Sequence, residues 1–232
     1  MIIPPDPGWV YQTLYSHFGP QGWWPAEDGL EVIAGAVLVQ NTSWRNAARA
    51  VRQLRTQVGF EPGDILAVEE HELARMICAA GTFRVKARRL RAVFHFLQEN
   101  GSVDGLSVWP TPSLRRALLT VHGIGPETAE AILLYAFQRP VFVVDAYARR
   151  LFARLGIDAA DAPYNDFSSW MQSRLLPDVA LMNELHALVV KQCKDVCRRQ
   201  PRCESCSVSA GCAFWEDRRQ RLPEGIAGSD SR

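Results

Sequence analysis

Residues 118–155 read LLTVHGIGPETAEAILLYAFQRPVFVVDAYARRLFARL, and this stretch decides the fold. Gly123 and Gly125 flank Ile124 immediately before a helix that is predicted to begin at Pro126, where the missing N–H of proline costs nothing. Two glycines permit a tight turn and a close approach of a ligand to the backbone amides. Together with the positive end of the helix, these amides would form an anion site suited to phosphate. For a lone G-x-G, an ordinary corner between two helices remains the alternative.

The flanks of this turn favour a helix–hairpin–helix. Apolar residues recur at helical spacing on both sides of the glycines, and they are Leu118, Leu119, Val121, Ala129, Ile132, Leu133 and Ala136. The string HGIGPETAEAILLYAF followed by VFVVDAYARR resembles the hairpin and the catalytic aspartate of the endonuclease III superfamily of DNA glycosylases. The resemblance covers nearly the whole chain from Trp23 to Cys212.

This resemblance implies an all-α fold of two helical lobes with a DNA-binding groove between them. No long stretch of the sequence is rich in strand signals, which agrees with an all-α chain. The first lobe is expected to comprise residues 25–135 and to end in the helix–hairpin–helix. The second is expected to combine residues 1–24 with residues 136–215. Residues 216–232 are expected to form a disordered tail.

Asp145 follows an apolar run and opens a predicted helix with the sequence AYARRLFARL. Its side chain could simply cap that helix by accepting backbone N–H bonds. In the superfamily, the aspartate at the matching place serves catalysis, so both roles are predicted at once. A carboxylate at a helix start stays ionised at neutral pH because backbone donors and the helix dipole favour the charged form. Its negative charge would then stabilise positive charge that develops on a sugar.

Members of the superfamily that also cleave the DNA backbone carry a lysine two residues beyond the second glycine of the hairpin. Glu127 stands at that position here, and a carboxylate cannot supply the amine of a Schiff base. The resemblance therefore implies a monofunctional DNA N-glycosylase of base excision repair, which hydrolyses the N-glycosidic bond with water and Asp145. Glu127 itself is either a favourable charge in a first helical turn or a contact to a cationic, alkylated base.

Two other functions remain open. A bifunctional endonuclease III with DNA-(apurinic or apyrimidinic site) lyase activity would need another amine, for which Lys86 is a candidate. A non-catalytic protein that binds damaged DNA would keep the fold without the chemistry. The lesion is also open, because alkylated purines, oxidised pyrimidines and mismatched thymine all remain candidates.

Aromatic and polar residues of the N-terminal half are candidates for the base pocket. The strings WWP and QNTSW resemble the branch of the superfamily that includes 3-methyladenine glycosylases. That resemblance implies that Trp24 and Trp44 line the pocket and that Gln40 fills the gap left by the flipped nucleotide. Thr82 matches the loop that wedges into the opposite strand, although it is smaller than the apolar wedge of endonuclease III. Stacking of bases on aromatic side chains is the physical basis of such a pocket.

The 232-residue chain has a net charge of only +1, so any DNA affinity must come from charges gathered on one face. Two basic clusters, within residues 84–91 and 191–202, could contact phosphates or could be solvated helix faces. With the hairpin, the predicted phosphate contacts are His122, Gly123, Gly125, Lys86, Arg198 and Arg199. No apolar run is long enough to span a bilayer. The resemblance implies binding to duplex DNA that contains damaged bases, and with no membrane-spanning run we expect a cytoplasmic, nucleoid-associated monomer that binds no membrane.

Four of the six cysteines form a C-x5-C-x2-C-x5-C pattern, namely Cys197, Cys203, Cys206 and Cys212. So many thiols in one tail of an intracellular protein favour a metal over disulfides. The spacing alone leaves zinc and an iron–sulfur cluster as alternatives. Endonuclease III relatives carry a 4Fe-4S cluster at this point with nearly this spacing, so the resemblance implies that cofactor. The first interval is one residue shorter here, which makes Cys193 a candidate substitute ligand.

Overall fold

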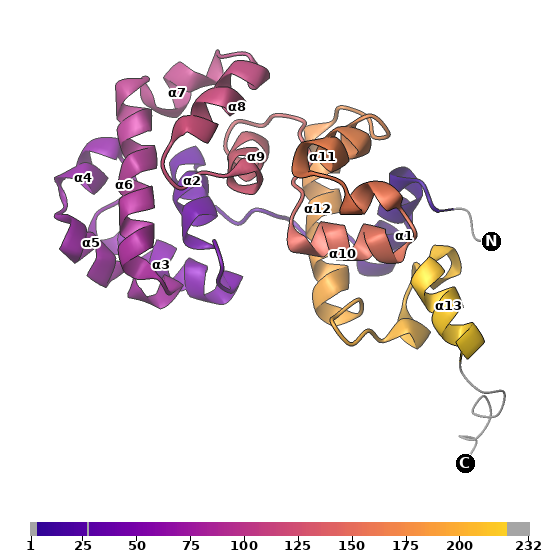
Figure 1. The fold of residues 1–232 in the computed structure, drawn as a ribbon. Helices are drawn as coiled ribbons and strands as arrows, with labels where there is room; N and C mark the ends of the chain where they lie inside the picture. The colour runs from indigo at the N-terminus through magenta and orange to yellow at the C-terminus, as the bar shows by residue number, and fades with distance from the viewer. Residues whose placement is uncertain (1–3, 27, 222–232) are drawn as a thin grey trace. The chain divides into compact units, whose positions relative to one another are not determined.

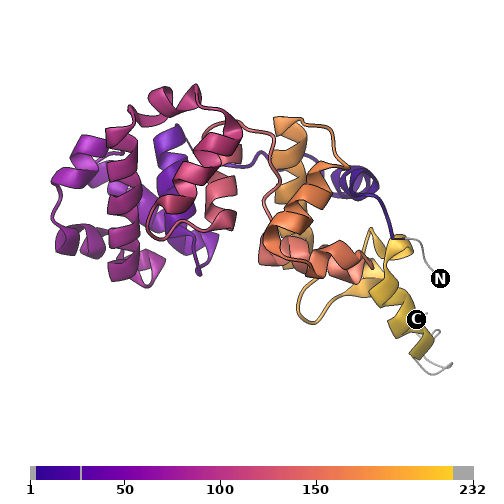
Figure 2. The same cartoon turned by 45° about the horizontal axis from the view of Figure 1, so that its top comes forward.

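The computed structural model describes residues 4–26 and 28–221, and the regular elements within these ranges are all helices (Figure 1). The predicted all-α fold is thereby confirmed. The chain divides into two units, which Figure 2 shows from a second side. The first, called here the hairpin unit, comprises residues 22–143. The second, called the cysteine unit, combines residues 1–21 with residues 144–232.

The central helix of the hairpin unit is α2 (Gly29–Leu38). Asp28 caps it by accepting the N–H of Glu31 at 2.8 Å, and the residues from Glu31 to Leu38 are all buried. Three helices pack around it, and these are α3 (Trp44–Gln57), α6 (Phe83–Glu99) and α9 (Pro126–Tyr135). A helix that is apolar around its whole circumference must be covered on all sides, and this is the position that its sequence GLEVIAGAVL predicts.

Shorter helices complete the hairpin unit. They are α4 (Pro62–Ala67), α5 (Glu70–Met76), the 3-10 turn η1 (Cys78–Ala80), α7 (Ser102–Ser107) and α8 (Thr111–Thr120). Two turns of this unit carry predicted site residues. Thr82 is exposed and has a φ of 38° at the turn before α6, while Gly123 has a φ of 84° between α8 and α9. Both are therefore held in the left-handed region at the tips of helix–turn–helix corners.

The hairpin unit is slightly longer than residues 25–135. At its start, the Trp23 ring lies 5.1 Å from the ring of Trp44 on α3, so this tryptophan belongs to the hairpin unit. At its end, the Arg139 guanidinium donates to the carbonyl of Trp109 at 3.2 Å, which attaches the segment after α9. Phe142 and Val143 are buried in the same segment. Side chains that lie outside the regular helices thus extend the unit at both ends.

The cysteine unit is arranged around its longest helix, α12 (Val179–Asp195). Asp178 caps α12 by accepting the N–H of Leu181 at 3.0 Å, and α1 (Pro7–Phe18) and α10 (Ala146–Arg154) pack against it. The remaining elements are the 3-10 turns η2 (Asp158–Asp161), η3 (Cys203–Ser205) and η4 (Ser209–Gly211), and the helices α11 (Tyr164–Gln172) and α13 (Ala213–Arg221).

The predicted disordered tail is wrong for residues 216–221, which continue α13. This helix holds ion pairs at i,i+3 and i,i+4 spacing, Glu216 with Arg219 and Asp217 with Arg221, and pairs at such spacings stabilise exposed helices. The rest of that predicted tail lies outside the described residues. Within the described ranges, we find no helix with the length and apolar character needed to cross a membrane.

Candidate nucleic-acid interface, catalytic carboxylate and metal centre

The hairpin between α8 and α9 presents the N-terminus of α9. Gly125 is the N-cap residue of α9, Pro126 is its first residue, and within the described chain no side chain caps this end. His122, Gly125 and Glu127 are exposed. A helix start without a capping side chain leaves its first N–H groups directed outward, where an anion can accept from them. The structure therefore places three of the predicted site residues on one turn.

A polar brace holds this hairpin against the rest of its unit. The Gln40 amide nitrogen donates to the carbonyl of Gly123 at 3.1 Å and to the hydroxyl of Thr128 at 2.9 Å. The Arg89 guanidinium donates to the amide oxygen of Gln40 at 2.6 Å. In addition, a Cβ on Gly123 would lie 2.2 Å from Cγ of Arg89, so only glycine fits against that side chain. We call these contacts among Gln40, Arg89, Gly123 and Thr128 the hairpin brace.

Lys86 is buried, and its predicted contact with phosphate is wrong. Only 1% of the residue is exposed. Its ammonium donates to the carbonyls of Leu38 at 2.9 Å and of Ala80 at 2.7 Å. Burial, with a smaller effect of the Arg89 charge, lowers the pKa of Lys86 to about 8. Lys86 therefore joins the end of α2 to the turn that carries Thr82, and it does not reach the surface.

An aromatic cluster forms on α2 in the hairpin unit. The ring of Trp24 lies 4.8 Å from that of Trp44 and 5.0 Å from that of Tyr135. A Cβ on Gly35 would lie 3.1 Å from the Trp24 ring, so the small residue lets the indole rest on the helix. The structure thus brings the two predicted pocket residues together and adds Tyr135. Sequence spacing gives no signal for that third ring, because its partner Trp24 lies far away in the chain.

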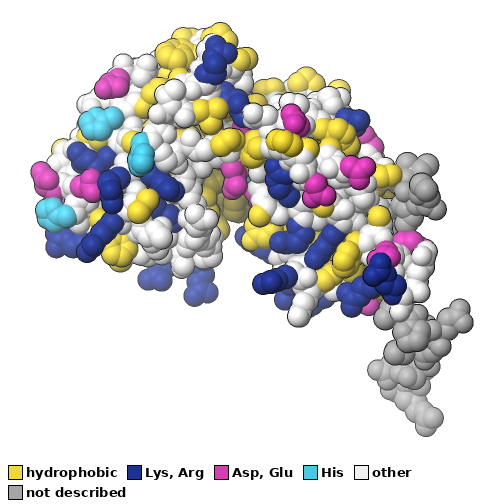
Figure 3. Space-filling model, in the orientation of Figure 1, with side chains coloured by type: hydrophobic (Ala, Val, Ile, Leu, Met, Phe, Trp, Pro, Cys, Tyr) yellow, Lys and Arg dark blue, Asp and Glu magenta, His cyan; other side chains and the backbone are white. Residues whose placement is uncertain are grey.

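Exposed arginines on α3 form a basic surface that is not among the predicted phosphate contacts. Arg45, Arg49 and Arg52 are exposed, whereas Ala47, Ala50, Val51 and Leu54 are buried on the opposite side of the helix. Figure 3 shows Lys and Arg side chains in dark blue along the lower edge of the hairpin unit, where α3 lies in Figure 1. Their i,i+4,i+7 spacing was a usable signal, since such residues share one face of a helix.

Asp145 lies at the N-cap of α10 in the cysteine unit. Its Oδ1 accepts the N–H of Ala148 at 2.7 Å, so the capping role that the sequence predicts is present. Its Oδ2 lies 3.6 Å from Nε2 of His186 on α12. The N–H of the preceding Val144 donates to the hydroxyl of Tyr164 at 3.1 Å, which fixes the backbone that enters the helix. One carboxylate oxygen is thus held by a hydrogen bond, the other faces His186, and 13% of the side chain stays exposed.

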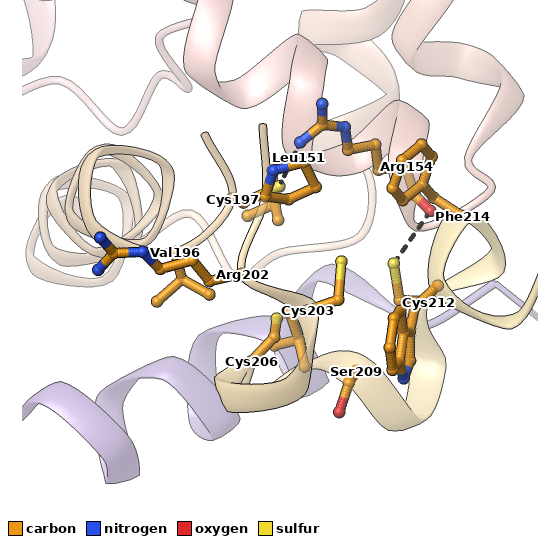
Figure 4. Close-up of a pocket in the computed structure, with 13 residues that line it drawn as sticks. Leu151, Arg154, Val196, Cys197, Arg202, Cys203, Cys206, Ser209, Cys212 and Phe214 are labelled. Atoms are coloured by element: carbon orange, nitrogen blue, oxygen red, sulfur yellow. Dashed lines mark hydrogen bonds between the residues drawn. The ribbon is translucent and has the colours of Figure 1, made fainter. Parts of the chain in front are cut away.

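All four predicted metal ligands line a single cavity (Figure 4). They are Cys197, Cys203, Cys206 and Cys212, and all four lie in the segment of residues 196–212 that joins α12 to α13 and contains η3 and η4, called here the cysteine loop. Among the described residues, no group of three or more His, Cys, Asp or Glu side chains is arranged to hold a metal ion in this conformation. The four thiols thus line one cavity, but they do not have the geometry of a formed metal site.

Polar contacts tune the sulfur atoms and hold the cysteine loop to α10. The Arg154 guanidinium donates to Sγ of Cys197 at 3.3 Å and to the carbonyls of Arg198 at 2.6 Å and Arg199 at 3.2 Å. A hydrogen bond from the Cys193 thiol, assisted by Arg154, lowers the pKa of Cys197 to about 6. Burial raises the pKa of the thiols of Cys203, Cys206 and Cys212.

The positions of Cys193, Arg198 and Arg199 follow from these contacts. Cys193 does not line the cavity; its Sγ lies 3.4 Å from the carbonyl oxygen of Tyr147. Arg198 and Arg199 use their carbonyls to bind Arg154, and both residues are exposed. The two arginines are thus available to an anion at the surface of the cysteine loop.

Comparison with known proteins agrees with this arrangement. Residues 34–173 match the family described as "HhH-GPD superfamily base excision DNA repair protein". A protein of Methanocaldococcus jannaschii, provisionally named DNA repair glycosylase MJ1434, is 41% identical over 206 residues, which cover 88% of this chain and 94% of that protein. The chain therefore belongs to the HhH-GPD superfamily of base excision DNA repair proteins.

Solved structures support the same conclusion. The 3-methyladenine DNA glycosylase MagIII of H. pylori, bound to 1,N6-ethenoadenine, is 25% identical with a TM-score of 0.71 and covers 81% of this chain and 97% of its own. A non-covalent endonuclease III–DNA complex has a TM-score of 0.77 at 21% identity and covers 92% of this chain and 97% of that one, which shows the shared fold. The predicted superfamily and the predicted enzyme class, a DNA glycosylase, are confirmed.

Proposed function

We propose that this glycosylase is monofunctional, and that it removes a damaged base from duplex DNA by hydrolysis with Asp145 as the catalytic carboxylate. The observation that carries the proposal is the geometry of Asp145. One carboxylate oxygen is fixed by the N–H of Ala148 at 2.7 Å, while part of the side chain remains exposed to a substrate. A carboxylate that is already oriented can stabilise positive charge on the sugar, or accept a proton from water, without reorganising.

The lysines of the chain support hydrolysis over Schiff-base chemistry. There are only three, at positions 86, 191 and 194. Lys86 is buried in the hairpin unit, where its ammonium donates to two carbonyls, and Lys191 pairs with Asp195 at 2.7 Å. Glu127 occupies the exposed position at the start of α9, where bifunctional members carry their lysine. A carboxylate has no amine with which to attack the sugar, so water is the proposed nucleophile.

DNA contacts are proposed on both units. The open N-terminus of α9, with His122, Gly123 and Gly125, would bind phosphate through backbone N–H groups. Arg198 and Arg199 would add charged contacts from the cysteine loop. Thr82, at its exposed turn, remains the proposed wedge. Lys86 fixes this turn by donating to the carbonyl of Ala80. Gln40 acts in this proposal through the hairpin brace, because three polar partners already hold its amide.

The aromatic cluster supports an electron-poor purine as the substrate base. Trp24 and Trp44 are half-buried, and Tyr135 backs Trp24 with only 5% exposure. Indole faces attract cationic and electron-poor rings, as in alkylated purines. The relative from H. pylori was solved with an etheno-modified adenine, which is the same chemical class. Glu127 would assist if it approaches a cationic base.

We also propose that Cys197, Cys203, Cys206 and Cys212 hold a 4Fe-4S cluster. The residues fit such a group in number and donor type, and all four line one cavity. Four thiolates are the usual ligand set of this cofactor, and zinc is the alternative for the same donors. The cluster would supply structural cross-linking of the loop that carries Arg198 and Arg199. Analysis of iron, sulfide and zinc in the purified protein distinguishes the two.

A direct assay tests the proposed activity. Duplexes carrying a single alkylated, oxidised or mismatched base are incubated with the protein and analysed before and after alkali. Monofunctional base release gives strand breaks only after alkali, with the largest yield expected for alkylated purines. Breaks without alkali, together with a borohydride-trapped adduct, would show lyase activity through an amine of the chain. No product on any duplex would favour a protein that only binds damaged DNA.

A further inference from the structure

We infer that His186 is a positioning residue for Asp145: its Nε2 fixes the direction of the carboxylate oxygen that is not used in the helix cap. This inference rests on the proposed catalytic role of Asp145. Oδ1 is committed to the N–H of Ala148 at 2.7 Å, and Oδ2 faces Nε2 of His186 at 3.6 Å. The side chain of Asp145 is 13% exposed and that of His186 is 9% exposed, so both groups are largely shielded from solvent.

The location of His186 argues for a role beyond packing. It lies on a buried face of α12 together with Met182, Leu185 and Val189. An aliphatic side chain would satisfy packing there, whereas a buried imidazole costs free energy unless polar groups compensate it. The group that its Nε2 faces is the carboxylate of Asp145. The sequence thus places a costly polar ring beside the one carboxylate on which the proposed reaction depends.

The distance between the two groups is set by the packing of α10 on α12. Arg150 on α10 donates to the carbonyl of Cys197 at 2.9 Å and to that of Cys193 at 3.2 Å. These bonds fix the register of the two helices about two turns from His186. Because both backbones are held, the imidazole and the carboxylate keep a fixed relative position.

A distance of 3.6 Å is too long for a hydrogen bond in the DNA-free protein. Catalytic hydrogen bonds are often long in free enzymes and shorten when substrate binds. A contraction of a few tenths of an ångström would let Nε2–H donate to Oδ2. Asp145 would then be held at both oxygens, and its charge would point in one direction. The proton stays on the imidazole throughout, so His186 orients the carboxylate and takes no part in bond cleavage.

Two variants of equal polarity test this inference. In His186→Gln, the side-chain amide nitrogen can reach the position of Nε2, whereas in His186→Asn the shorter side chain stops near the position of Nδ1. The single-turnover rate constant of base release is measured on a lesion duplex, along with the dissociation constant for that duplex. Because misplacing a catalytic group can cost about 10- to 100-fold, we expect a loss of that size for His186→Asn. His186→Gln should retain most of the rate, and both dissociation constants should stay within about twofold of the wild-type value.

The outcomes separate the inference from the proposed function. If the Gln and Asn variants have equal rate constants, whether both are normal or both are reduced, the positioning role is wrong. A further check uses Asp145→Asn, in which adding His186→Asn should lower the residual rate no further, because groups that act as a unit are non-additive. If Asp145→Asn itself releases base at the wild-type rate, the proposed function fails together with the inference. If only the Gln and Asn comparison fails, the role of Asp145 still stands.

Discussion

The hairpin brace makes Gly123→Ala the most informative single change in the hairpin unit. Gly123 has a φ of 84°, a region that costs a non-glycine residue about 1–2 kcal/mol. The new Cβ would also lie 2.2 Å from Cγ and 2.5 Å from Cδ of Arg89. Arg89 must therefore move and release its 2.6 Å hydrogen bond to Gln40. A hydrogen bond to a charged group contributes about 1.5–3 kcal/mol, so we expect a total loss of about 2.5–5 kcal/mol in the free energy of unfolding.

Gly125→Ala is the matched control on the same turn. Gly125 has a φ of −93°, and a Cβ there would meet nothing within 4 Å. Alanine is a poorer N-cap than glycine, so we expect a loss of about 1 kcal/mol in the unfolding free energy, well below the loss for Gly123→Ala. Urea unfolding, followed by tryptophan fluorescence and far-UV circular dichroism, measures both variants. In the double variant Arg89→Ala/Gly123→Ala the clash is absent, so its loss should be smaller than the two single losses combined.

The same pair separates folding from DNA binding. Because Gly125→Ala leaves the protein itself unstrained, a drop in its DNA affinity would report contact of that turn with phosphate. The reasoning about the hairpin brace would be refuted if Gly123→Ala and Gly125→Ala unfolded at the same urea concentration. It would also be refuted if removing Arg89 failed to relieve the effect of Gly123→Ala.

Three further predictions concern buried contacts. Folding lowers the pKa of Lys86 from 10.5 to about 8, so between these pH values the unfolded chain binds a proton that the folded chain has lost. As the pH rises from 8 to 10.5, the unfolding free energy of the wild type should therefore increase by about 3 kcal/mol relative to that of Lys86→Met. A difference between the two proteins in urea unfolding that does not change with pH would contradict this. Arg154→Met removes the donor to Cys197 and two loop carbonyls, so a chelator should extract iron from the proposed cluster several-fold faster than from the wild type, and an unchanged rate would show that the guanidinium does not hold the loop. Gly35→Ala places a Cβ 3.1 Å from the Trp24 ring, which should lower base release more than binding of undamaged duplex; equal losses in the two assays would argue against a base pocket at this ring.

Local signals predicted much of the fold. The capping residue Asp145 before a helical run predicted α10, because both the cap and the helical face are encoded within one short segment. The glycine pair with Pro126 predicted the start of α9 in the same way. The cysteine spacing predicted thiols around one space, since four ligands within a short loop have little freedom to separate.

Contacts between distant segments could not be predicted from such signals. Gln40 and Gly123 are 83 residues apart, and no local pattern in either segment predicts their hydrogen bond. For Lys86, by contrast, a signal was present in the sequence. It precedes the buried residues Leu90, Val93 and Leu97 at spacings of four, seven and eleven residues, which places it on the apolar face of α6. The run of basic residues around it concealed this periodicity.

The relation between His186 and Asp145 shows the same limit. A histidine within an apolar helical stripe is consistent with a structural role, and the sequence does not show that α10 presents a carboxylate to it. Only the packing of α10 on α12 brings Nε2 to 3.6 Å from Oδ2. Tertiary packing, not local propensity, therefore decides which polar residues of this chain act together.

The most direct test of the account compares the wild type with Asp145→Asn on a duplex that carries one alkylated purine. Asparagine keeps the size of the side chain and can still cap α10, so folding and DNA binding should be preserved. We predict that the wild type gives strand breaks only after alkali, and that Asp145→Asn gives a rate of base release lower by about 100-fold or more, in the range that loss of an acid–base or electrostatic group produces. Equal base release by the two proteins, or strand breaks without alkali, would contradict hydrolysis by Asp145.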